Sequence, residues 1–212
     1  MSKLKEIHDY LVSVGENEEE LRNIYDIVPR LLSEEIARYA HRNQKRENGE
    51  EYVNHPLRCS YYLDYPKSFY EEYGMNEEEV ETLCKLHDVV EDSELTLEDL
   101  RDIFVECRLG EFFEYSIQKQ LDALTHRKDE EYDAYIERCM EYPSSALVKY
   151  LDLHDNLNVF TLVSFDEDKY NRCLKYIKYL YRINSKYKFI ETSNKFMRYK
   201  EIENKESIYK EI

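Results

Sequence analysis

Two doublets of ionisable residues, His87-Asp88 and Glu91-Asp92, stand close together in the stretch Leu83–Asp92. On one short helical segment, side chains three and four positions apart share a face, which places Glu91 above His87 and Asp88. The same spacing places Asp92 above Asp88. Imidazole and carboxylate groups crowded in this way can bind a divalent cation or transfer protons. The stretch alone is equally consistent with a helix end that carries a core histidine and solvated acids.

Candidate partners for this stretch occur in two other segments. His55 precedes Pro56 at the predicted start of a helix, and the proline restricts the backbone of His55. Further along, Lys149, Asp152 and Asn156 recur at intervals of three and four residues, so they share one face of a helix. A solvated helix surface would show the same polar spacing, and the residues alone leave both interpretations open.

The composition is typical of a soluble globular chain, with 42% hydrophobic and 36% charged residues among 212, and favours a single domain. The net charge of -16 argues against non-specific binding to nucleic acid or to an anionic membrane. No run approaches the roughly 18 apolar residues of a membrane-spanning helix, and the polar start does not resemble a signal peptide. An anionic substrate would therefore need a metal ion or a few basic side chains.

The five cysteines are widely spaced and include no Cys-x-x-Cys pair. An odd number at such spacing predicts buried free thiols in a reducing cytoplasm rather than disulfides or a zinc site.

Helices joined by short loops are predicted, because only four glycines and four prolines interrupt the chain. Ser33, Asn76 and Thr96 are the expected N-terminal caps of three of these helices. The predicted helices lie within 3–30 (one or two), 33–41, 52–63, 67–74, 76–92, 96–105, 112–124, 129–140, 143–163 and 166–183. No stretch alternates like a strand, so the predicted fold class is all-α. The expected core covers about 33–185, with an N-terminal helical cover over 1–32 and a peripheral tail over 186–212.

The order of His55, His87-Asp88 and Asp152 on separate helices resembles the pattern of the HD phosphohydrolase superfamily. Longer blocks resemble the RelA/SpoT-type alarmone hydrolase domain. Residues 40–56 (AHRNQKRENGEEYVNHP) resemble its AHxGQxRxxGxxYxxHP signature, residues 87–92 are identical to its HDVVED core, and residues 123–125 and 148–156 match its xLT and VKxADxxxN elements. The blocks follow the family's order over roughly residues 33–165.

This resemblance implies an HD-type helical bundle around a divalent metal, usually manganese. The positions that match the metal ligands are His55, His87, Asp88 and Asp152. Glu91 and Asp92 match the acids that position or deprotonate the attacking water and serve the leaving group. The family reaction is removal of the 3′-pyrophosphate from guanosine penta- or tetraphosphate.

Four further positions match the family's substrate pocket: Arg46, Tyr52, Lys149 and Asn156. Arg46 matches the residue that packs against the guanine base. For Tyr52 and Lys149 a structural role is an equal alternative, as a packing tyrosine and as a lysine paired with Asp152. His126 has no matched role and is expected at the surface.

Some features depart from the family pattern. Asn43 replaces a usual glycine, and Glu47 replaces a commonly basic residue beside Arg46, which weakens the expectation of strong polyphosphate binding. Leu153-His154-Asp155 also differs from the Arg-Leu-His of long bifunctional relatives. The chain ends roughly 60 residues after Asp152, so a hydrolase-only member without a synthetase domain is expected.

Alternative functions therefore stay open. The substrate could be another nucleotide or a phosphorylated dinucleotide cofactor, or the chain could be a catalytically idle nucleotide-binding module. Against an idle module stands the complete set of six metal-site and acid-base residues. In every case the expected partner is a small nucleotide rather than nucleic acid or a membrane, and the oligomeric state is left open.

Overall fold

The computed structural model of the chain describes residues 2–16, 28–158 and 162–194. Over these ranges the regular structure is helical, and the β-type pairing is limited to one isolated antiparallel bridge between Lys45 and Glu51. The predicted all-α fold class is therefore confirmed. None of the helices in these ranges combines the length and the apolar character needed to cross a membrane.

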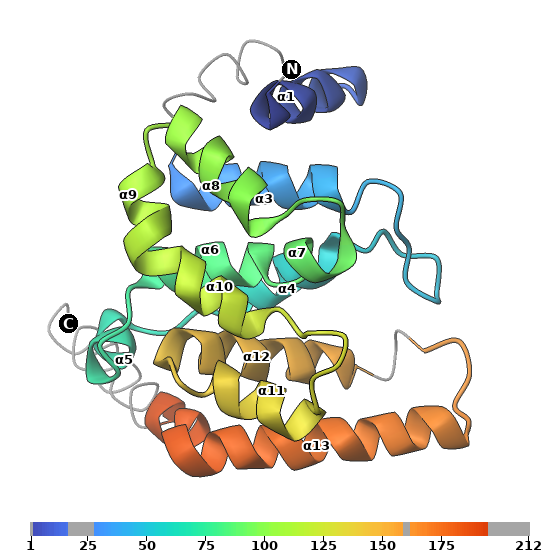
Figure 1. The fold of residues 1–212 in the computed structure, drawn as a ribbon. Coiled ribbons are helices and arrows are strands. Elements are labelled where there is room, and N and C mark those ends of the chain that lie inside the picture. The colour runs from blue at the N-terminus through green and yellow to red at the C-terminus, as the bar shows by residue number, and fades with distance from the viewer. Residues whose placement is uncertain (1, 17–27, 159–161, 195–212) are drawn as a thin grey trace, which may run out of the picture.

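The helices stack in layers (Figure 1). They are α1 (Lys3–Ser13), α3 (Pro29–Ala40), α4 (Asn54–Tyr61), α5 (Lys67–Glu72), α6 (Glu77–Leu86), α7 (Val89–Asp92), α8 (Leu97–Glu106), α9 (Gly110–Phe112), the π-helical turn η2 (Phe113–Ile117), α10 (Gln118–Leu124), α11 (Tyr132–Cys139), α12 (Pro143–Asn156) and α13 (Glu167–Tyr187). Helix α6 lies at the centre and packs against α3, α4 and α12, while α13 forms the outer layer beside α12.

The core is one connected cluster of buried apolar side chains. Helix α6 is surrounded on most sides, since Val80, Leu83 and Leu86 are all fully buried. Burying each such side chain contributes about 2 kcal/mol, so packing around α6 fixes the positions of its neighbours. Leu4 of α1 and Phe189, which follows α13, belong to the same cluster.

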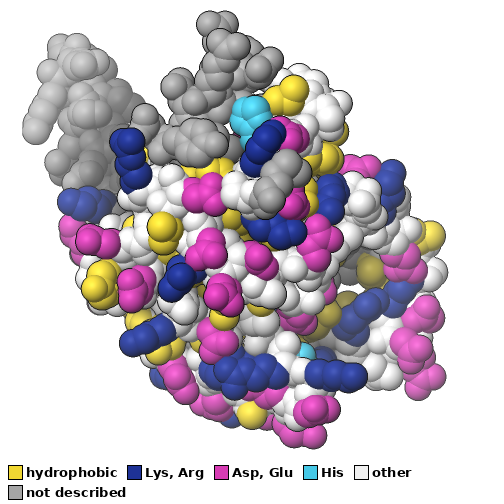
Figure 2. Space-filling view, turned by 45° about the horizontal axis from the view of Figure 1, so that its top comes forward, with side chains coloured by type: hydrophobic (Ala, Val, Ile, Leu, Met, Phe, Trp, Pro, Cys, Tyr) yellow, Lys and Arg dark blue, Asp and Glu magenta, His cyan; other side chains and the backbone are white. Residues whose placement is uncertain are grey.

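Charged side chains of both signs are interspersed over the face drawn in Figure 2. The cysteines follow the expected pattern in part. Cys59, Cys84, Cys107 and Cys139 are buried free thiols as predicted, whereas Cys173 on α13 is half-buried.

Two predicted caps are confirmed and one is wrong. The Asn76 side chain accepts hydrogen bonds from the backbone N–H groups of Glu78 and Glu79, and Thr96 forms a capping box with Asp99. Ser33 does not cap α3, because that helix already begins at Pro29. Proline suits the first turn of a helix, where its missing N–H costs nothing, and the Ser33 hydroxyl donates to the Arg30 carbonyl inside the helix.

The helix that carries the two doublets is not continuous. Helix α6 ends at Leu86 and α7 begins at Val89, so His87 and Asp88 occupy the junction. Asp88 has ψ of -7°, away from the helical value, although the Asp92 N–H still bonds to the Asp88 carbonyl at 2.8 Å. The single helical segment predicted from spacing is therefore wrong, and the doublets lie on either side of a bend.

Helix α12 is shorter than predicted. It ends at Asn156 rather than near residue 163, and the part of the predicted helix at 159–161 lies outside the described residues. Two asparagines, Asn156 and Asn158, stand at this end, and asparagine is a weak helix former.

The Asn76 cap gives a test of local stability. Asn76→Ala removes the acceptor for two N–H groups at the start of α6, so we expect the free energy of unfolding to fall by about 1 kcal/mol. Urea denaturation followed by circular dichroism measures the change. Asn171→Ala, an exposed position inside α13, is the control and should leave stability unchanged or slightly raised. Equal losses in both variants would contradict the capping role.

Candidate metal-assisted active site

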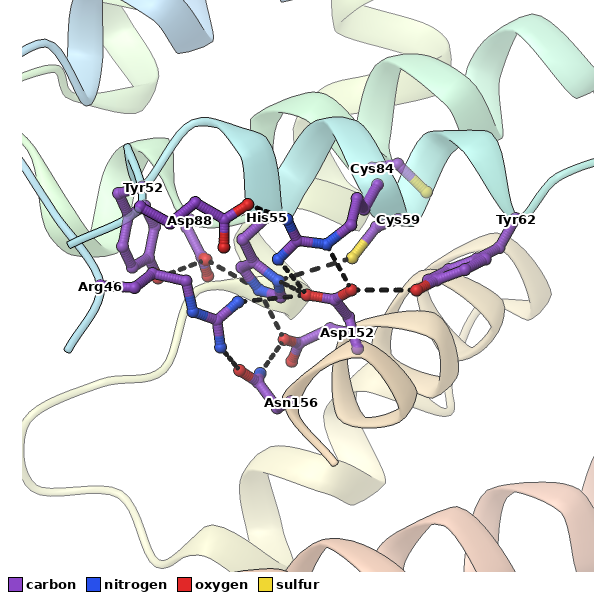
Figure 3. A network of polar contacts seen from close by, with 12 residues as sticks. Arg46, Tyr52, His55, Cys59, Tyr62, Cys84, Asp88, Asp152 and Asn156 are labelled. Atoms are coloured by element: carbon purple, nitrogen blue, oxygen red, sulfur yellow. Dashed lines mark hydrogen bonds and ion pairs between the residues drawn. The ribbon is translucent and has the colours of Figure 1, made fainter. Parts of the chain in front are cut away.

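The predicted metal ligands come from three segments that the packing brings together. His55 lies on α4, His87 and Asp88 lie at the junction of α6 and α7, and Asp152 lies on α12. Helix α4 packs against both α6 and α12. The His55, Asp88 and Asp152 side chains therefore lie around one point (Figure 3). Residues separated by almost a hundred positions in the sequence thus form one cluster.

The cluster has the dimensions of a cation site. One ligand atom each from His55, His87 and Asp88 lies within 4.8 Å of the others. Nε2 of His55 lies 3.1 Å from Asp152 Oδ1 and 3.6 Å from Asp88 Oδ2. Nε2 of His87 lies 3.1 Å from Asp88 Oδ2 and 3.7 Å from Asp152 Oδ1. The two Nε2 atoms and two carboxylates therefore face one another.

Hydrogen bonds fix which nitrogen of each histidine faces the cluster. Nδ1 of His87 lies 2.7 Å from the Cys84 carbonyl oxygen, which can only accept, so Nδ1 carries a proton. Nδ1 of His55 likewise donates to Asp155 Oδ2 at 2.7 Å. With Nδ1 protonated in this way, loss of the proton from Nε2 leaves a neutral ring whose Nε2 lone pair faces the cluster, as in metal-binding histidines. Nε2 of His87 is buried and has no hydrogen-bond partner among the described residues, which is the state expected of a ligand atom.

The electrostatics of the cluster also favour a cation. Burial disfavours charge on all of these groups, yet Asp88 and Asp152 raise the pKa of His87 well above its usual range. Asp152 also raises the pKa of His55 against the effect of burial. In return, His87 holds the pKa of Asp88 below its usual range, and Lys149 does the same for Asp152. Positive charge is stabilised at this point, and a divalent ion would supply it.

The two predicted catalytic acids lie beside the cluster. Asp92 Oδ2 lies 3.1 Å from the Tyr52 hydroxyl, which also lies 2.8 Å from Asp88 Oδ2. Glu91 Oε2 accepts from the His126 backbone N–H at 2.9 Å. Burial, reinforced by the nearby Asp88 carboxylate, raises the pKa of both Glu91 and Asp92. A carboxyl group whose pKa lies above its usual range holds a proton more readily, which suits it to proton transfer.

His126 was expected at the surface without a role, but its backbone N–H has one, because it donates a hydrogen bond to Glu91. Hydrogen bonds from Arg138 fix the conformation of the loop that follows α10. The guanidinium donates to the carbonyl oxygens of Asp122 and Thr125 and to the Glu130 carboxylate. This loop presents the His126 N–H to Glu91. No sequence signal could have revealed this contact, since every residue type except proline supplies a backbone N–H.

Three of the four predicted substrate-binding residues line one cavity of about 180 Å³. They are Arg46, Tyr52 and Asn156. Arg46 is held in place because its guanidinium donates to Asp155 Oδ2 at 3.1 Å and to Asn156 Oδ1 at 2.8 Å. The cavity is smaller than those that enclose a whole drug-sized ligand, so it could enclose only part of a nucleotide.

Lys149 lies elsewhere. Its Nζ donates to Asp152 Oδ2 at 2.6 Å and lies 4.9 Å from the centre of the Tyr135 ring. Both Lys149 and Asp152 are buried, so a solvated polar face is excluded for this part of α12. The geometry supports the alternative of a lysine paired with Asp152.

Asp155 was not recognised from the sequence as part of the site. Its carboxylate is fully buried and accepts from His55, from Arg58 Nε at 2.9 Å and from the Tyr62 hydroxyl at 3.0 Å. It therefore orients the His55 ring from the side opposite the cluster, as carboxylates do for metal-binding histidines. The available signal was its position three residues after Asp152, on nearly the same face of α12.

Fold and site together define a helical domain with a buried His/Asp cluster compatible with a divalent metal. The chain is 32% identical over 180 residues to the guanosine-3′,5′-bis(diphosphate) 3′-pyrophosphohydrolase of Aquifex aeolicus (strain VF5), covering 82% of this chain and 23% of that relative. The chain thus spans about a quarter of the length of the curated relative that it matches.

The fold is similar to the solved structure of a metazoan ortholog of SpoT that hydrolyses ppGpp and plays a role in starvation responses. The TM-score is 0.56 at 23% identity, and the match covers 74% of this chain and 85% of that one. No protein-family model matches the chain. The resemblance to RelA/SpoT-type hydrolases predicted from the motifs is confirmed, and the fold is the HD-type helical fold.

Asp155 gives a test of this description. Asp155→Asn leaves the partly buried Arg46 without its carboxylate, leaves Arg58 with Glu50 alone, and weakens the support of His55. We expect the free energy of unfolding to fall by about 2 to 3 kcal/mol and affinity for Mn²⁺ to fall at least about tenfold. Tyr62→Phe, which removes one neutral donor to Asp155, is the matched control and should cost about 1 kcal/mol with metal affinity unchanged.

Chemical denaturation and titration calorimetry with Mn²⁺, both at a temperature where the variants are folded, measure the two quantities. Wild-type metal affinity in Asp155→Asn would show that this carboxylate only stabilises the fold.

Proposed function

We propose that the chain is a divalent-metal-dependent nucleotide phosphohydrolase that removes the 3′-pyrophosphate from guanosine tetra- or pentaphosphate. The observation that carries this proposal is the convergence of the His/Asp cluster, the two flanking acids and the cavity lined by Arg46. The named relatives, which hydrolyse guanosine 3′,5′-bis(diphosphate), support the choice of substrate. Because the chain matches only part of the curated relative, the activity is proposed for this chain rather than transferred to it.

The proposed metal ligands are the cluster residues His55, His87, Asp88 and Asp152. Two imidazole nitrogens and two carboxylates form a mixed donor set suited to Mn²⁺, the ion we propose. A divalent ion bound there supplies Lewis acidity and lowers the pKa of a coordinated water. Asp155 orients the His55 ring, and Lys149 balances the charge of Asp152.

Glu91 and Asp92 are the proposed acid-base pair. Burial and the neighbouring Asp88 carboxylate raise the pKa of both groups, which favours proton transfer by them. The attacking water adds to the phosphorus while the bond from phosphorus to the ribose 3′ oxygen breaks. One carboxylate takes the proton of the water, and the other carboxyl group gives a proton to the departing 3′ oxygen. The Tyr52 hydroxyl, which lies between Asp88 and Asp92, holds Asp92 beside the cluster, and the His126 N–H holds Glu91.

The cavity supplies the binding groups for the nucleotide. The Arg46 guanidinium presents a planar cationic face that can stack on a purine ring. Lys45, Lys169 and Arg172 add positive charge to the lining of the cavity, which suits a phosphorylated ligand. The free thiols fit a reducing compartment, and we propose that the chain acts in the cytoplasm on a small nucleotide, as part of the stringent response to starvation.

Substrate identity is tested by a panel of nucleotides incubated with the protein and Mn²⁺. We expect release of pyrophosphate from guanosine tetra- and pentaphosphate and none from the adenosine counterparts at equal concentration. Phosphate-release and chromatographic assays detect the products. Activity on simple nucleotides or on a phosphorylated dinucleotide cofactor alone would reject the alarmone substrate but keep the phosphohydrolase class. Inactivity on the whole panel together with tight nucleotide binding would favour an idle binding module.

The division of roles between the doublets is tested by Asp88→Asn and Glu91→Gln. We expect Asp88→Asn to lose bound metal and activity together, because an amide is a neutral and weaker ligand. Glu91→Gln should keep about one metal ion per chain and lose at least about a hundredfold in kcat. Elemental analysis and initial rates measure the two effects. Equal loss of metal in both variants would contradict the proposed roles.

A further inference from the structure

An ion pair spans the wall of the cavity. Lys169, in the first turn of α13, donates from Nζ to Glu47 Oε1 at 2.7 Å and to the Ser164 hydroxyl at 2.7 Å. Glu47 belongs to the loop that connects α3 to α4 and carries Arg46. The pair therefore ties that loop to the start of α13, and both of its members line the cavity.

The two partners differ in their exposure to water. Lys169 is 7% exposed, whereas the Glu47 side chain is 51% exposed. A lysine buried to this extent needs an anionic partner, but a half-exposed glutamate can leave for water at little cost. The ammonium group is thus fixed at the cavity wall, and its carboxylate partner is replaceable.

The side chains that line the cavity are mainly basic. Among the described residues that line the cavity, Lys45, Arg46, Lys169 and Arg172 are basic and Glu47 is the single acid. Arg46 is already engaged by Asp155 and Asn156 on α12. The Glu47 carboxylate therefore occupies, at Lys169, the place that a phosphate oxygen of a bound nucleotide could take.

We propose that Lys169 is a phosphate-binding residue and that Glu47 determines specificity by competing with the ligand for it. An incoming phosphate group displaces the Glu47 carboxylate from Nζ, and the carboxylate turns to solvent. The competition weakens binding of every phosphorylated ligand. It also sets a threshold that a ligand with more phosphate charge passes more easily. This inference uses the nucleotide of the proposed function but concerns a different pair of residues from the acid-base and metal groups.

The inference predicts opposite effects from the two partners. Glu47→Gln removes the competing charge, so KM should fall about tenfold with kcat unchanged. Lys169→Met should raise KM about tenfold. Lys169→Arg keeps the positive charge, so its KM should stay close to the wild-type value. In the double variant, Glu47→Gln should give no further gain, because its effect acts through Lys169.

The matched control is Asp133→Asn. Asp133 also pairs with cations of α13, Lys178 and Arg182, but it does not line the cavity. The substitution changes the net charge of the protein by the same amount, so KM should stay at the wild-type value. Steady-state rates with Mn²⁺ at constant ionic strength provide both constants.

The outcomes separate this inference from the proposed function. If the wild type hydrolyses the substrate and Glu47→Gln has an unchanged KM, or one that changes as in Asp133→Asn, the competition is overturned and the proposed function stands. If the wild type hydrolyses none of the guanosine substrates, the proposed function fails. Calorimetry with inorganic pyrophosphate then decides the inference. Tighter binding by Glu47→Gln than by the wild type supports it, and equal binding overturns it.

Discussion

The buried carboxylates of the cluster must be compensated by positive charge, and the surrounding structure provides this compensation. Asp88 and Asp152 face the Nε2 atoms of His55 and His87 in a largely buried space. An uncompensated carboxylate in such surroundings costs several kcal/mol. The two imidazoles and the Lys149 ammonium offset part of this cost, and a divalent cation would offset the remainder. The site is therefore an assembly in which each charge is stabilised by its neighbours.

Helix α12 connects the cluster to the cavity lined by Arg46. Asp152 and Asp155 stand three residues apart on this helix, so one carboxylate faces the cluster while the other supports His55 from behind. Asp155 also accepts from Arg46, which belongs to the loop at the cavity wall. The orientation of a proposed metal ligand and the position of a proposed base-stacking residue thus depend on one buried carboxylate. A change at Arg46 is expected to affect the cluster as well as the cavity.

Periodicity and capping residues predicted the helical class and most helices, because apolar spacing and caps act locally. The cap predicted at Ser33 was wrong because the helix already begins at Pro29. The continuous helix predicted through residues 87–92 was wrong because a bend separates the two doublets. The convergence of His55, His87, Asp88 and Asp152 at one point could be predicted from the family resemblance, because the motifs specify these side chains. The spacing of Asp155 from Asp152 places it near the same face of α12, but its contact with His55, 100 positions away, depends on the packing of the fold. The contact of the His126 N–H with Glu91 depends on the packing alone.

The charge of the chain bears on what the cavity can select. A net charge of -16 opposes the approach of other anions to the chain as a whole. Screening limits that repulsion to about 8 Å at physiological ionic strength, so a local group of cations can still attract a small anion. The cavity concentrates basic side chains at such a point, and Glu47 reduces their effect by pairing with Lys169. The net charge of the whole chain and the group of cations in the cavity thus act on an approaching small anion in opposite directions.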